Sequence, residues 1–120
     1  MSKNDFVRVP SMYLSFLKSK IHRAKVTECD LYYEGSISID LNYMEKVGIF
    51  ENEKVDVLNL NNGSRISTYA ISAARDSNKI GLNGAAARTA QVGDLVIILS
   101  YALISHDEVP TWKPEIIILN

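Results

Sequence analysis

The sequence predicts a mainly β fold, a small closed barrel with short helices. Short segments rich in β-branched residues recur along the 120 residues, and each one ends in residues typical of turns. No repeat or low-complexity linker interrupts them, so we expect a single domain over residues 1–120. A barrel is favoured over a flat sheet because so many short strands would otherwise leave unpaired edges in water.

Two strands are expected in the first third of the chain. The segment KIHRAKVT, residues 20–27, has the composition of a strand, and a second strand follows through Tyr32 and Tyr33. In that second strand, GSISID at 35–40, isoleucines alternate with polar residues, which predicts a half-buried strand.

A short helix and a hairpin should come next. Asp40 can cap a helix over residues 41–48, and Gly48 supplies its C-terminal stop. Asn62-Gly63, between strands at 54–60 and 65–73, is a strong hairpin signal. The remaining elements are, in order, a turn at 75–79, a strand at 80–83, a short helix at 84–90, the turn Val92-Gly93-Asp94, a strand at 95–103, a polar loop at 105–114 and a last strand at 115–119.

Composition argues against several classes of function. The 13 Lys and Arg residues balance 14 Asp and Glu, and no basic block is present, so nucleic acid is not an expected partner. The single Cys29 cannot form an intrachain disulfide, and two histidines without a CxxC pair do not make a zinc site. The longest apolar run, residues 95–104, is about half a membrane span. We therefore expect a cytoplasmic protein without a metal or a membrane segment.

The Gly35-Ser36 pair is unusual because it stands at the entrance of a strand, where glycine weakens pairing. A bulge or a tight bend would explain it, and so would a peptide bond that is meant to break. No GxSxG elbow, Walker loop, HExxH or GxGxxG motif accompanies it. A serine hydrolase that uses Ser36 would need a histidine base, for which His22 is the candidate.

Seven polar residues lie on predicted strands where apolar residues would pack better. Individually, each is also explained as a solvated strand face, a core tyrosine with a wet hydroxyl, or a turn. Taken together, their cationic, phenolic and amide groups suit a small dianionic acid. They are Lys20, His22, Tyr33, Arg65, Thr68, Tyr69 and Asn83.

Three separated motifs together resemble the pyruvoyl-dependent aspartate 1-decarboxylase family. They are KSKIHRAKVTECDLYYEGSISID, NNGSRISTYAI and LNGAAARTAQVGDLVII, and the likeness runs from about Leu17 to Pro114. The resemblance implies a double-psi β-barrel, in which the Val92-Gly93-Asp94 turn is similar to the Gly-Asp box of such barrels. It also implies a homotetramer with active sites between subunits.

The resemblance further implies a proenzyme that cuts itself between Gly35 and Ser36 into residues 1–35 and 36–120, with or without a maturation factor. The Ser36 hydroxyl would attack the Gly35 carbonyl, and Ser36 would become a pyruvoyl cofactor. Glycine leaves that carbonyl sterically open and permits strained backbone angles. The Thr68 and Asn83 positions would assist this cleavage.

The substrate implied by the resemblance is L-aspartate, which would lose CO2 to give β-alanine for pantothenate and coenzyme A synthesis. Tyr69 would return a proton to the substrate carbon, and Arg65 and Lys20 would pair with substrate carboxylate. His22 and Tyr33 would line the pocket, with further contacts from Gly84, Ala85 and Ala86. The alternative is a non-enzymatic binding module of the same fold, with Gly35-Ser36 as a bend.

Overall fold

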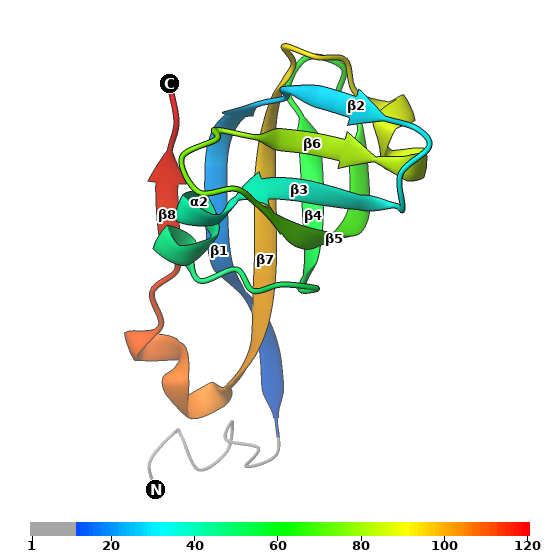
Figure 1. The fold of residues 1–120 in the computed structure, drawn as a ribbon. Coiled ribbons are helices and arrows are strands. Elements are labelled where there is room, and N and C mark those ends of the chain that lie inside the picture. The colour runs from blue at the N-terminus through cyan, green and yellow to red at the C-terminus, as the bar shows by residue number, and fades with distance from the viewer. Residues whose placement is uncertain (1–11) are drawn as a thin grey trace, which may run out of the picture.

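Eight strands and three short helical segments make up residues 12–120, the part of the chain that the computed structural model describes (Figure 1). In chain order they are β1 (Tyr13–Lys25), β2 (Glu28–Asp30), β3 (Ser36–Asp40), α2 (Leu41–Val47), β4 (Lys54–Asn59), β5 (Arg65–Ala73), β6 (Ile80–Asn83), the 3-10 helix η1 (Gly84–Thr89), β7 (Leu95–Ser105), the 3-10 helix η2 (His106–Thr111) and β8 (Glu115–Ile118).

The strands form one mixed sheet in the order β2-β6-β3-β5-β4-β7-β1-β8. Parallel pairs join β2 to β6, β3 to β5 and β1 to β8, and the other neighbours are antiparallel. In Figure 1, β2, β6 and β3 cross the direction of β1, β7 and β4 at a steep angle. The mainly β fold with short helices is confirmed, and its crossed, mixed sheet is consistent with a double-psi β-barrel.

The core lies between these two crossing sets of strands. Ile37 and Ile39 of β3 and Leu82 of β6 join the same buried cluster as Ile21 of β1 and Ile98 of β7. All five side chains are fully buried. Because these residues come from segments distant in sequence, packing of this cluster fixes β3 and β6 against the rest of the sheet.

The first strand is much longer than the predicted segment 20–27. β1 runs from Tyr13 to Lys25, and its first half pairs with the far half of β7, where Tyr13 is opposite Ser105. This two-stranded arm extends away from the barrel (Figure 1) and contributes to a molecule 58 Å long and about 25 Å across. Its partner is more than eighty residues away, so no local pattern marks the arm.

The strand β3 is central rather than half-buried, which corrects the expected alternation. All five residues from Ser36 to Asp40 are buried. β3 lies between β5 and β6, so both of its edges are paired. The polar face that alternation assigned to solvent is covered by protein, and each polar side chain on it needs a partner inside the molecule. β2, only three residues long, was not predicted.

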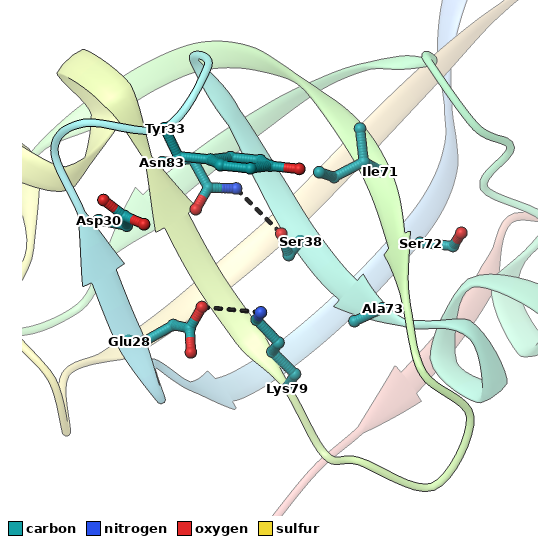
Figure 2. A pocket seen from close by; sticks show the side chains of 9 residues that line it. All are labelled: Glu28, Asp30, Tyr33, Ser38, Ile71, Ser72, Ala73, Lys79 and Asn83. Carbon is teal, nitrogen blue, oxygen red and sulfur yellow. Dashed lines mark hydrogen bonds and ion pairs between the residues drawn. The ribbon is translucent and has the colours of Figure 1, made fainter.

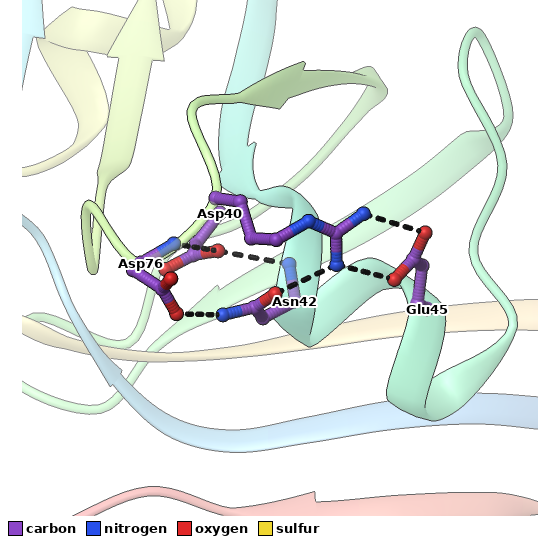
Figure 3. A network of polar contacts seen from close by, with 5 residues as sticks. Asp40, Asn42, Glu45 and Asp76 are labelled. Carbon is purple, nitrogen blue, oxygen red and sulfur yellow. Dashed lines mark hydrogen bonds and ion pairs between the residues drawn. The ribbon is translucent and has the colours of Figure 1, made fainter.

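The predicted helix is confirmed at both ends. Asp40 Oδ1 accepts a 2.8 Å hydrogen bond from the Asn42 backbone N–H, and Gly48 adopts φ 74° after the last turn. Asp40 also accepts from the Asn78 backbone N–H at 2.8 Å and from the Asp76 backbone N–H at 3.3 Å. Figure 3 shows the Asp76 contact, through which this carboxylate ties the 75–79 turn to α2. An Arg75–Glu45 ion pair at 2.6 Å closes the same network on the surface.

The later elements also follow the predictions. Strands β4 and β5 flank Asn62-Gly63 as a hairpin, β6, β7 and β8 lie where expected, and the helix at 84–90 is the 3-10 helix η1. The loop at 105–114 contains η2, and the Trp112 indole after it donates to the Leu17 carbonyl at 2.8 Å. Within residues 12–120, no helix has the length and apolar character needed to cross a membrane.

Candidate active site

The Ser36 hydroxyl is held by two hydrogen bonds at the start of β3. The side chain is fully buried. Its Oγ donates to the Glu34 carbonyl at 3.0 Å and accepts from the Asn83 Nδ2 at 3.0 Å. Ser36 and Asn83 are direct partners in the antiparallel ladder between β3 and β6, so the sheet register itself brings them together.

Gly84 lies in close contact with Gly35, the residue before Ser36. It adopts φ 65°, which favours glycine, and a Cβ built on it would lie 2.7 Å from the Gly35 Cα and 2.8 Å from the Gly35 nitrogen. Asn83-Gly84 therefore contacts both sides of the Gly35–Ser36 bond and is more than a turn. Of the neighbouring alanines, Ala85 is exposed and Ala86 is buried.

Gly35 does not use the positive φ values that glycine allows. Its φ lies outside the left-handed region, and a Cβ at Gly35 would meet no atom within 4 Å. Gly35 therefore has open space at its Cβ position, whereas Gly84 lies close to its Cα and nitrogen.

Thr68 and Tyr69 lie beside this junction by register. β3 and β5 are parallel, with Ile37 opposite Ala70. Continuing that register backwards by one residue, within both strands, places Tyr69 beside Ser36, and Thr68 precedes Tyr69 on β5. Both side chains are half-buried.

Lys20, His22, Arg65 and Tyr69 occupy one outer face of the sheet. On β1, Lys20 and His22 alternate with the fully buried Ser19 and Ile21, so they point away from the core. The ladder places Arg65 opposite Leu58, and Tyr69 opposite Lys54, on the corresponding face of β5 and β4. These four side chains share a face, although they are spread over several strands.

Arg65 is already engaged by neighbours on that face. Its guanidinium lies 3.1 Å from Asp56 Oδ2 and donates to the Tyr101 hydroxyl, also at 3.1 Å. These hydrogen bonds, with Tyr101 first and Asp56 second, raise the pKa of Arg65, so it stays a cation. The side chain is 56% exposed, which leaves it open to an anion.

Lys20 and His22 lie on a strand that does not pair with β3. β1 is separated from β3 in the sheet by β7, β4 and β5. The Ser36 hydroxyl bonds to Glu34 and Asn83 and not to His22, so the serine–histidine pair that the hydrolase alternative requires is not formed within one chain. His22 Nδ1 is buried and has no hydrogen-bond partner among residues 12–120.

A cavity of about 220 Å³ opens beside the junction (Figure 2). Tyr33, Ser38 and Asn83 line it on one side, and an ion pair between Glu28 and Lys79, at 2.7 Å, borders it on another. Asn83 Nδ2 donates to Ser38 Oγ at 2.9 Å, as Figure 2 shows. Sequence reasoning missed Ser38 as a site residue, although a serine between two buried isoleucines was the available signal.

The Val92-Gly93-Asp94 turn is held by hydrogen bonds to residues distant in the sequence. The Gly93 N–H donates to the Val26 carbonyl and the Val26 N–H donates to the Asp94 carbonyl. The Asp94 carboxylate accepts from Asn59 Nδ2 at 2.8 Å and from the Gln91 N–H at 2.9 Å. These two hydrogen bonds lower the pKa of Asp94 and give the turn a structural role.

Comparisons with known proteins agree with each other. A family model described as aspartate decarboxylase matches residues 12–120. Aspartate 1-decarboxylase from Burkholderia cenocepacia (strain HI2424) is 52% identical over 110 residues, which cover 91% of this chain and 86% of that protein. The enzymes of the same name from Paraburkholderia phymatum and Burkholderia thailandensis are each 53% identical with the same coverage.

The comparison with solved structures found, among others, the structure of a designed protein. It is the crystal structure of the computationally designed msDPBB_sym2 protein, with a TM-score of 0.46 and 19% sequence identity. The match covers 72% of this chain and 99% of the designed one.

Proposed function

The chain belongs to the aspartate decarboxylase family, and on that premise we propose that it converts L-aspartate to β-alanine and CO2, supplying pantothenate and coenzyme A synthesis. The observation that carries the proposal is the Gly35–Ser36 junction. A buried serine hydroxyl directly follows a glycine, and Asn83-Gly84 contacts both residues. A bend would need none of these contacts, which is why we prefer the enzyme to a binding module.

We propose that the chain matures by cutting itself into residues 1–35 and 36–120. Ser36 Oγ attacks the Gly35 carbonyl carbon, the peptide C–N bond breaks, and an ester replaces it while the nitrogen takes the hydroxyl proton. Loss of the Ser36 α-proton then expels the Gly35 carboxylate and leaves a dehydroalanine. Addition of water to that residue releases ammonia and leaves a pyruvoyl group at position 36.

The side chains around the junction suit this sequence of steps. Asn83 holds the Ser36 oxygen from one side and can stabilise negative charge on it. Thr68, which precedes Tyr69 on β5 near the start of β3, would donate a hydrogen bond to the carbonyl under attack. The Ser36 hydroxyl must first leave the Glu34 carbonyl, and a maturation factor would assist by promoting that rearrangement.

A pyruvoyl group supplies the electron sink that no ordinary side chain offers when a carboxylate leaves as CO2. The chain's own residues then bind the substrate and move a proton. Arg65 and Lys20 bind carboxylate groups, with Arg65 suited to a two-point contact. Tyr69, beside position 36 by register, returns a proton to the substrate carbon. His22, Tyr33 and the Gly84–Ala86 backbone shape the pocket.

We propose a homotetramer because, within one chain, the cation Lys20 and the Ser36 junction lie on strands that do not pair with each other. Lys20 and Arg65 share an outer face with the half-buried apolar side chains of Leu58, Ile97 and Leu99. A neighbouring copy that covers this face would remove apolar surface from water and could bring a Ser36 junction toward these cations. The assembly would act in the cytoplasm, where Cys29 remains a free thiol.

The test is to incubate the matured protein with L-aspartate and to quantify β-alanine and CO2. Both products should form in equal amounts, and borohydride treatment should abolish their formation by reducing the ketone of position 36. Size measurement of the same sample should give a tetramer. Absence of β-alanine from protein that stays intact would favour the binding module instead.

A further inference from the structure

The side-chain amide of Asn83 makes two hydrogen bonds to two serines of the same strand. Its Nδ2 donates to Ser36 Oγ at 3.0 Å and to Ser38 Oγ at 2.9 Å. An amide NH2 carries two protons, so both donors are used. Asn83 is only 2% exposed, which leaves water little access to either bond.

The direction of these bonds follows from the Ser36 hydroxyl. That hydroxyl has one proton, which it donates to the Glu34 carbonyl. Only oxygen lone pairs then remain to face Asn83, and lone pairs require an N–H donor rather than the amide oxygen. The side-chain amide must therefore present its nitrogen to β3.

Ser38 supplies the second point that fixes this nitrogen. Ser36 and Ser38 lie two residues apart on β3, so their hydroxyls point to the same side of the strand, while Ile37 and Ile39 point into the core. One hydrogen bond to Ser36 would leave the amide free to rotate about it. Two acceptors at a spacing fixed by the strand hold the amide in one orientation.

We infer that Ser38 is a positioning residue for self-cleavage, acting through the Asn83 amide on the oxygen of Ser36. The inference rests on the proposed function and adds a residue that sequence reasoning did not assign. Ser38 is 5% exposed, and burying a hydroxyl costs free energy unless it is bonded. Asn83 is the partner that makes serine acceptable at this position.

The first experiment follows self-cleavage of the full chain by electrophoresis and intact mass. Ser38→Ala should cleave about 2- to 10-fold more slowly than the wild type, the range that one net hydrogen bond supports. Ser38→Thr keeps the hydroxyl, and the adjacent cavity has room for its methyl group, so it should cleave at close to the wild-type rate. Ser72→Ala, which changes another serine lining that cavity, is the matched control and should have no effect.

A double-mutant cycle separates positioning from general loss of structure. If Ser38 acts through Asn83, Ser38→Ala should slow cleavage in the wild-type background and have no additional effect in an Asn83→Ala background. The inference would be overturned if Ser38→Ala slowed cleavage by the same factor in both backgrounds. It would also be overturned if the Ser38→Ala single variant cleaved at the wild-type rate.

A second measurement does not depend on cleavage. In the Ser36→Ala chain, Ser38 is the remaining acceptor, so NMR should find slow hydrogen exchange of the Asn83 side-chain amide, and adding Ser38→Ala should accelerate it. Equal exchange in the two chains would overturn the inference. If the wild-type chain does not cleave at all, the proposed function fails, and this exchange measurement alone decides whether Ser38 holds Asn83.

Discussion

Gly84→Ala tests whether the close contact between Gly84 and Gly35 matters for self-cleavage. The new Cβ would lie 2.7 Å from the Gly35 Cα, whereas carbon atoms pack best at about 3.5–4.0 Å. The backbone must therefore move by about 1 Å at the bond to be cut. A displacement of about 1 Å in a reacting geometry can cost about 100-fold in rate, which is the slowing we expect.

The same substitution should also destabilise the uncut chain. Alanine in the left-handed region costs about 1–2 kcal/mol, and the added crowding costs about 1–3 kcal/mol more. Gly63→Ala is the matched control, because Gly63 has φ 76° but no atom within 4 Å of its built Cβ. It should carry the backbone cost alone and cleave normally.

The two costs can be measured separately. Urea unfolding of Gly84→Ala and Gly63→Ala, each in a Ser36→Ala background, compares stability without cleavage. Cleavage rates are then measured with Ser36 restored. If Gly84→Ala and Gly63→Ala lose equal stability and cleave at equal rates, the contact between Gly84 and Gly35 has no role in the reaction.

Three further predictions concern turnover and acid stability. Tyr69→Phe should cleave itself normally but form β-alanine about 100- to 10,000-fold more slowly, and unchanged turnover would remove Tyr69 from proton transfer. Arg65→Ala should raise KM for L-aspartate, and Arg65→Lys should restore it only in part because lysine has no planar fork; full recovery would indicate charge attraction alone. Hydrogen bonds from Asn59 and Gln91 lower the pKa of folded Asp94 below its ordinary 3.8, so its contribution to stability is present above that pH and disappears as pH falls through the folded value. Asp94→Asn should therefore flatten the acid-unfolding curve in this range, and an unchanged curve would contradict the assignment.

Elements with local signals were predictable from the sequence. Asp40 and Gly48 mark both ends of α2, and Asn62-Gly63 marks the turn between β4 and β5, because capping and turn geometry depend on neighbouring residues. The arm of β1 and the short β2 depend on partners far along the chain, so a local pattern could not show them.

The candidate site was predictable in its residue types but not in its contacts. The motifs around Ser36 and Asn83 suggested that both belong to the site, and the β3–β6 ladder makes them direct partners. Alternation assigned Ser38 to solvent, because the sequence does not show that β3 is paired on both edges and covered on both faces. Lys20 and Ser36 lie on strands that do not pair with each other, which follows from the sheet order and could not be predicted from local sequence patterns.

Intact mass of the purified, warmed protein tests the central claim most directly. We expect two chains, residues 1–35 ending in Gly35 and residues 36–120 lighter by one ammonia than a fragment with a free N-terminal serine. Ser36→Ala should remain one chain and form no β-alanine. A wild-type chain that stays whole after prolonged warming, alone and in an extract of its source cells, yet still makes β-alanine would contradict the self-cleavage mechanism.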